Sequence, residues 1–94
     1  MKIRIYVTKK DILTGVKANC NHCPVALALK RRIKSDLYVE VKASCINISD
    51  VYILNDLNVY QFINYFDGCP RKNMDTIKPI RFMIEIPSDY LKGK

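Results

Sequence analysis

The segment from Cys20 to Lys34 constrains the fold more than any other part of the chain. Two thiols three residues apart, Cys20 and Cys23, run directly into Pro24. Proline fits the first turn of a helix because its missing N–H has no partner to lose there. Apolar side chains then cover one broad side of the helical wheel, and cations cover most of the other side. The sequence therefore predicts a helix from Pro24 to about Lys34, with Cys23 as its N-cap.

The rest of the chain alternates between the spacing of strands and the spacing of helices. Thr8 and Asp11 match a capping box and predict a single helical turn that ends at Gly15. A second helix is predicted after Asp56, and it should end with Gly68 in the left-handed conformation. Apolar residues that alternate with polar ones predict strands over residues 3–7, 37–41, 46–48, 51–54 and 80–86.

These elements predict an α+β fold with one mainly antiparallel sheet of four or five strands and two helices on one face. The order is strand, helix, two or three strands, helix, strand, which is compatible with the split βαβ arrangement. The chain has 94 residues and is 49% hydrophobic, so one domain is expected over residues 1–87. Residues 69–77 are predicted to form a loop, and residues 88–94 a frayed tail.

The apolar runs of the chain are too short to cross a membrane. The longest, Pro24 to Leu29, has six residues, whereas a membrane span needs roughly 20. The N-terminus alternates charged and branched residues and shows no apolar signal region. We therefore expect no membrane partner and a cytoplasmic location, where thiols are kept reduced.

The charge balance is strongly basic. Lys and Arg number 16 against nine Asp and Glu, which gives a net charge of +7. Such a charge favours polyanionic partners such as a nucleic acid, a nucleoprotein or an acidic protein surface. A basic protein that is merely soluble has the same composition, so net charge alone leaves both interpretations open.

The cysteines allow three kinds of chemistry. Cys20 and Cys23 have the spacing of half a zinc site, and Cys45 and Cys69 are the candidates for closing it, with His22 inside the first pair. A thiol at a helix start is also stabilised as a thiolate, which suits a redox pair. In the third interpretation Cys23 caps the helix, Cys20, Cys45 and Cys69 are small core residues, and no cofactor is bound.

Catalysis has little support in the sequence. His22 is the only histidine, and it has no motif partner among the acids or serines. The three glycines form no phosphate-binding pattern. We therefore expect a protein that is not an enzyme and has no catalytic residue.

Two surfaces combine cations with apolar or aromatic residues. On the outward face of the predicted sheet, cations lie beside tyrosine rings, as in proteins that bind single strands; its members are Arg4, Tyr6, Tyr38, Lys42 and Arg81. The second surface lies on the cationic side of the helix that starts at Pro24; it comprises Leu27, Lys30, Arg31 and Lys34, with Arg71 and Lys72 as candidates to extend it. For the first pattern a solvated sheet face is the more frequent explanation, and for the second a segment that covers Leu27.

Four short motifs follow one another along nearly the whole chain: Val7-Thr8-x-x-Asp11-Ile12-x-x-Gly15, Cys20-x-x-Cys23-Pro24-Val25-Ala26-x-Ala28-Leu29, Phe62-Ile63-x-x-Phe66-Asp67-x-x-Pro70 and Pro79-x-Arg81-Phe82. Together they resemble a group of small, mostly uncharacterised proteins encoded by bacteriophages and prophages. The resemblance supplies no activity and no catalytic residue. It implies a context, because small phage proteins of this kind commonly bind and redirect a host component, including defence nucleoproteins.

Three functional hypotheses follow. The first is a non-enzymatic phage-type protein whose basic surface binds a nucleic acid or a host nucleoprotein, for example as an inhibitor of host defence such as an anti-CRISPR protein. The second is a small zinc-stabilised or thiol-active protein built on Cys20 and Cys23. The third is a self-assembling structural module, such as a homodimer, joined through Leu27 and an edge strand.

Overall fold

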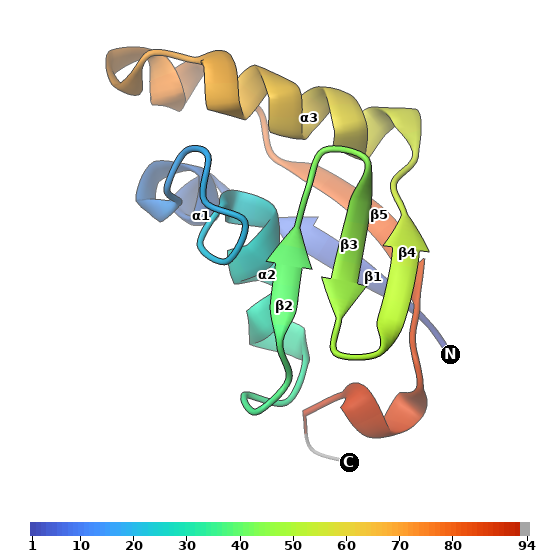
Figure 1. Cartoon of the computed structure of the whole chain (residues 1–94). Helices are drawn as coiled ribbons and strands as arrows, with labels where there is room; N and C mark the ends of the chain where they lie inside the picture. The colour runs from blue at the N-terminus through green and yellow to red at the C-terminus, as the bar shows by residue number, and fades with distance from the viewer. Residues whose placement is uncertain (93–94) are drawn as a thin grey trace.

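Two small antiparallel sheets enclose one helix in the computed structural model, which describes residues 1–92 (Figure 1). The order of elements follows the sequence patterns closely. The elements are β1 (Lys2–Val7), α1 (Lys9–Thr14), α2 (Pro24–Arg32), β2 (Val39–Val41), β3 (Cys45–Ile48), β4 (Val51–Leu54), α3 (Leu57–Gly68), the 3-10 helix η1 (Arg71–Thr76), β5 (Ile80–Glu85) and the 3-10 helix η2 (Ser88–Tyr90).

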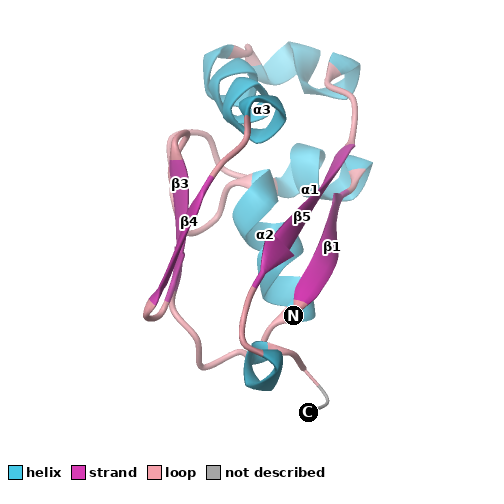
Figure 2. Cartoon of the chain, turned by 90° about the vertical axis from the view of Figure 1, so that its right-hand side faces the viewer, coloured by secondary structure: helices cyan, strands magenta, loops and turns pink. Residues whose placement is uncertain are grey.

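The predicted α+β class is confirmed, but the single sheet is wrong. Strands β1 and β5 form a two-stranded sheet, and β2, β3 and β4 form a separate three-stranded sheet. Figure 2 shows the two sheets on opposite sides of α2, and α2 contacts both β1 and β2. The helices therefore do not share one face of one sheet. Helix α3 lies across one end of this sandwich (Figure 1).

The side chains of α2 explain its place between two sheets. Val25, Ala26, Ala28 and Leu29 are almost completely buried, and at about 100° per residue they span nearly half of the helix circumference. A buried stripe this broad is wide enough to contact both β1 and β2. The two alanines also let neighbouring backbones approach closely, because they carry no bulk beyond Cβ.

The helix starts form as the sequence predicts. Thr8 and Asp11 make both hydrogen bonds of the capping box at the start of α1. Pro24 is the first residue of α2 and Cys23 is its N-cap, although the Cys23 side chain makes no capping hydrogen bond. At α3, the carboxylate of Asp56 accepts a hydrogen bond from the Val59 N–H at 3.0 Å. These contacts are local, which is why a pattern of four residues predicts them.

Three predictions about the second half of the chain are wrong. Gly68 is part of α3 and does not take a left-handed conformation, so the helix ends on an extended Cys69. Residues 71–76 form η1 inside the segment that was expected to be a loop. The tail is packed rather than frayed over residues 88–92: Leu91 is buried and pairs with Ile33. Residues 93 and 94, also predicted to fray, lie outside the described residues.

Other parts of the chain cover two of the strand edges. The Val41 N–H donates to the Cys20 carbonyl at 2.8 Å, and the Asn21 amide donates to the Val39 carbonyl at 2.7 Å, so the loop before α2 covers the outer edge of β2. Arginine side chains from α2 cover two carbonyls of β1, as described below. Within residues 1–92, no helix is long and apolar enough to span a membrane.

Candidate functional site

The outer face of the β1–β5 sheet gathers exposed cations and an exposed aromatic ring. The antiparallel register places Tyr6 opposite Arg81, Arg4 opposite Met83 and Lys2 opposite Glu85. Their neighbours along the strands point to the other side, where they are buried against α2. We call this surface the outer sheet face, defined by Lys2, Arg4, Tyr6, Arg81, Met83 and Glu85, all of which are exposed.

The outer sheet face suits a ligand that carries both rings and negative charge. Tyr6 is 51% exposed and lies directly across from a guanidinium, so a flat group could stack on the ring beside a cation. Three of the six side chains are cationic, and the only carboxylate, Glu85, lies at the far end opposite Lys2. A six-residue strand is about 20 Å long, so the face is long enough for several nucleotides.

A shallow groove continues the outer sheet face at the Tyr6 end. Its volume is about 480 Å³, and it runs between the end of β1 and the start of β5. The Lys9 ammonium beside it is held by two backbone carbonyls, of Asp75 and of Ile77, the latter at 3.0 Å. The groove is lined by Tyr6, Val7, Thr8, Lys9, Pro79, Ile80 and Arg81.

The structure brings together three of the five residues predicted for this surface. Arg4, Tyr6 and Arg81 share the outer sheet face. Tyr38 and Lys42 do not, because they flank β2 in the other sheet. There they adjoin Glu40: the Tyr38 hydroxyl donates to its carboxylate at 3.2 Å, and the Lys42 ammonium lies 3.8 Å from it. The error follows directly from the assumption of one sheet.

The cationic end of α2 is not the free basic patch that the sequence suggested. The Lys30 ammonium donates to the Asn21 carbonyl at 2.6 Å, and the Arg32 guanidinium donates to the Arg4 carbonyl at 2.6 Å. Leu27 is half-buried rather than presented to a partner, and Lys34 is half-buried as well. These side chains connect α2 to its surroundings, so their first role is structural.

Arg31 is the most extensively bound of these cations. Its guanidinium makes two hydrogen bonds of 2.9 Å to the two carboxylate oxygens of Asp11 and a third, also of 2.9 Å, to the Tyr6 carbonyl. Burial alone would raise the pKa of Asp11, but the bonds from Arg31 and from the Thr8 N–H outweigh it and lower that pKa. Arg31 therefore joins α1, α2 and β1, and its binding to a partner stays a prediction.

The basic pair after α3 is only partly free. The Arg71 guanidinium donates to the Gly15 carbonyl at 3.2 Å and so connects η1 to the end of α1. Lys72 is exposed on η1. The predicted extension of the α2 patch by this pair thus gains no support from Arg71, whose contacts lead to α1 instead.

The four thiols are not gathered into one metal site. Cys23, Cys45 and Cys69 are buried and Cys20 is half-buried. Within residues 1–92, no group of three or more His, Cys, Asp or Glu side chains lies close enough to hold one metal ion. The predicted closure of a zinc site by Cys45 or Cys69 is therefore wrong. His22 is exposed, with its Nδ1 3.3 Å from the Asn19 side-chain oxygen.

The two thiols of the first pair still share one environment. Burial raises the pKa of Cys23, the N–H groups of Val25 and Ala26 oppose this effect, and the Asp67 carboxylate raises the pKa further. On the three-stranded sheet, Cys45 lies beside Tyr52 of β4 and raises the pKa of the phenol. A neutral Cys23 is a weak nucleophile, which disfavours the redox interpretation.

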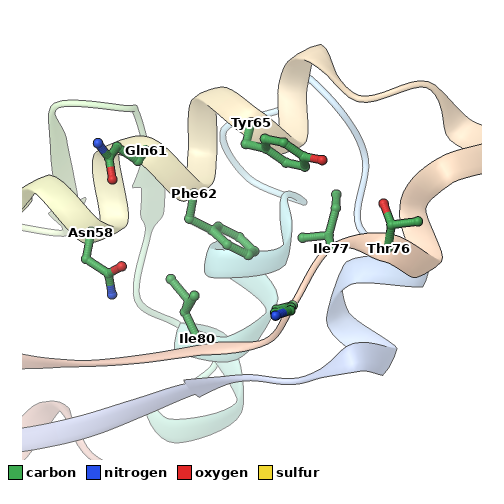
Figure 3. Close-up of a pocket in the computed structure, with 8 residues that line it drawn as sticks. Asn58, Gln61, Phe62, Tyr65, Thr76, Ile77 and Ile80 are labelled. Carbon is green, nitrogen blue, oxygen red and sulfur yellow. The ribbon is translucent and has the colours of Figure 1, made fainter.

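A second concave surface lies between α3 and the segment before β5 (Figure 3). Its volume is about 330 Å³, and Phe62, Ile77 and Ile80 form its apolar part, with Tyr65 near one end. No carboxylate, thiol or imidazole lines it, so it offers no acid, base or nucleophile of that kind. The complete lining is Asn58, Gln61, Phe62, Tyr65, Thr76, Ile77, Lys78 and Ile80.

Sequence reasoning missed two members of the outer sheet face and one structural cation. Lys2 and Met83 belong to the face by the same alternation that identified Arg4 and Arg81, so the signal was present. Arg32 gave no such signal. Its bond to the Arg4 carbonyl joins residues 28 positions apart, and sequence spacing does not reveal such contacts.

Comparisons with protein-family models, curated proteins and solved structures find no match to this chain. The resemblance to small phage proteins therefore stays a prediction from the motifs. Function has to be inferred from the residues and their geometry.

Proposed function

We propose that this chain is a non-enzymatic binding protein that holds a single-stranded nucleic acid on the outer sheet face. The observation that carries the proposal is the pairing of exposed Tyr6 with Arg81 across β1 and β5, with Arg4 next along the face. A nucleic-acid strand has the matching groups, since its bases stack on aromatic rings and its phosphates attract guanidinium and ammonium groups.

The open shape of the surface favours a single strand over a duplex. Sequence-reading proteins commonly insert an exposed helix into the major groove of DNA. Here the most basic helix, α2, is enclosed between two sheets, and its cations bond to the protein backbone. The outer sheet face instead has a ring flanked by cations. This arrangement resembles the sheets of RNA-binding modules, on whose aromatic side chains unstacked bases lie.

The net charge of +7 supports the same ligand. Long-range attraction raises the rate at which a polyanion meets the protein, even where individual lysines are not in contact with it. In the biological role that goes with this proposal, the strand belongs to a host nucleoprotein and its capture interferes with host defence. That role rests on the resemblance to small phage proteins alone.

The experiment is a fluorescence-anisotropy titration of labelled single-stranded 20-mers, one DNA and one RNA, with two matched tyrosine variants. Tyr6→Ala should weaken binding about 5- to 150-fold, because stacking on an aromatic side chain contributes about 1 to 3 kcal/mol per base. Tyr52→Ala is the control, since Tyr52 is 63% exposed, against 51% for Tyr6, but lies on the three-stranded sheet. Its affinity should match that of the parent protein.

Salt provides a second readout in the same titration. The affinity of the parent protein should fall steeply as salt rises, because phosphate contacts release counterions. Equal weakening by Tyr6→Ala and Tyr52→Ala, or no saturable binding to either 20-mer at low salt, would remove the outer sheet face as the site.

A further inference from the structure

Cys20 and Cys23 line one small cavity that lies away from the outer sheet face. The cavity has a volume of about 200 Å³ and is formed where the loop before α2 meets the β2–β3 turn and α3. Both thiols of the pair contribute to its wall, together with the carboxylate-bearing Asp67. The other lining residues are Ala18, Asn19, Val41, Lys42, Ala43 and Ile63.

The loop that carries the two thiols is held from several directions. The Ala18 N–H donates to the Asp67 carboxylate at 3.1 Å, and the Asn19 side-chain oxygen accepts from the N–H groups of Asn21 and His22. Ala18 has a φ of 54°, a conformation that a non-glycine residue keeps only when its surroundings enforce it. The loop is thus fixed before any ligand arrives, which lowers the entropic cost of binding.

The turn geometry allows both sulfurs to reach one ion. The N–H groups of His22 and Cys23 both donate to the Asn19 carbonyl, so residues 19–23 form a tight turn. Residues three apart in such a turn have Cα atoms less than about 7 Å apart. Two sulfurs share an ion when they come within about 4.6 Å, which is twice a metal–thiolate bond of about 2.3 Å. Side-chain rotation at Cys20, which is half-buried, can close this gap.

The charges around the pair suit a cation. The Cys20 sulfur lies 4.0 Å from a carboxylate oxygen of Glu40, and Asp67 lines the same cavity. Lys42 also lines it, but its ammonium is 3.8 Å from Glu40, so a carboxylate already balances that charge. Carboxylates beside thiols make the thiols poor nucleophiles, and a cation enters such surroundings more readily than an anionic ligand does.

We propose that Cys20 and Cys23 bind one soft monovalent metal ion of the Cu(I) type in this cavity. Thiolate ligands suit Cu(I), zinc and iron–sulfur clusters, and of these only Cu(I) is held by two thiolates alone. Zinc needs four ligands, and within residues 1–92 no group of three or more His, Cys, Asp or Glu side chains is arranged to hold one ion. Binding releases both thiol protons: Cu(I) plus two thiols gives a bis-thiolate complex of charge −1 and two protons.

The test is an anaerobic titration of the reduced full-length protein against Cu(I) held by bathocuproine disulfonate, whose absorbance reports the copper that it keeps. The parent protein should withdraw one Cu(I) per chain. Cys20→Ser should lose at least 100-fold in Cu(I) affinity, and it should keep its fold, because the Cys20 contact to β2 is made by its backbone carbonyl. Circular dichroism of the variant checks that point.

Cys45→Ser is the matched control. Cys45 is a buried thiol on β3 and is not part of the cavity lining. The control should bind copper as the parent does. If the parent withdraws no copper, or if Cys20→Ser withdraws as much as the parent, the proposal is overturned. Equal loss in the two variants would also overturn it, because the copper would then not depend on the cavity.

Discussion

Leu29→Ala is expected to destabilise the protein by about 3 to 5 kcal/mol, the range for large-to-small changes at fully buried leucines. Leu29 has 0% exposure and lies on α2, the helix between the two sheets. The loss approaches the whole stability of an average domain of this length, roughly 5 to 14 kcal/mol. Helix propensity does not explain it, because leucine and alanine are both good helix formers.

Urea unfolding followed by circular dichroism measures this effect. The control is Leu57→Ala, the same substitution on α3 at a side chain that is 68% exposed. It should change the free energy of unfolding by less than about 0.5 kcal/mol. Similar losses at both positions would show that α2 is not enclosed on both sides. Leu29→Met, which keeps most of the volume, should fall between the parent and Leu29→Ala.

Arg31→Ala is the second large effect, at about 2 kcal/mol of lost stability. Removing one partner of a buried ion pair leaves the other charge buried without a partner, which lowers the free energy of unfolding by about 3 to 5 kcal/mol. Asp11 is only 4% exposed, but the side chain of Arg31 is 48% exposed, so solvent screening reduces the expected loss. Arg31→Lys should recover only part of it, because an ammonium cannot make the paired contacts to both carboxylate oxygens.

The pH dependence identifies the ion pair as the cause. The pKa of Asp11 is lowered in the folded protein, so its contribution is fully present above the unfolded pKa of about 3.9 and is lost as the pH falls through the folded value. Thermal melts of the parent and of Arg31→Ala should therefore differ most near pH 7. The difference should shrink below about pH 4. A difference that stays constant from pH 7 to pH 2 would mean that the lost stability comes from packing alone.

Local patterns predicted most elements because the interactions that start and stop them are local. The capping box at Thr8 and Asp11 lies within four residues, as does the step from Cys23 to Pro24. Strand pairing is different. Alternation shows which residues of β5 point outward, but it does not show that β5 pairs with β1 alone. In the sequence, the alanines of α2 were the feature that indicated a helix packed closely against neighbours on two sides.

In the candidate site, too, local patterns could be predicted from the sequence and contacts between distant residues could not. Arg4, Tyr6 and Arg81 could be predicted because strand alternation fixes their face. The hydrogen bonds of Arg31 and Arg32 to the backbone could not be predicted in this way. Their acceptors are the carbonyls of Tyr6 and Arg4, which lie 25 and 28 residues away in the sequence. The sequence shows which residues are cationic. Whether these cations are free to bind a ligand depends on which backbone carbonyls the fold places beside them. The most basic segment was therefore an unreliable guide to a binding surface.

The most direct test of the central claim is a nuclear magnetic resonance titration of the isotope-labelled protein with a single-stranded 20-mer. The claim is that the outer sheet face, and not the cationic end of α2, receives the strand. The largest saturable shifts in amide signals should fall on β1 and β5, around Arg4, Tyr6 and Arg81. Shifts concentrated on residues 27–34 of α2, with β1 and β5 unchanged, would contradict the claim.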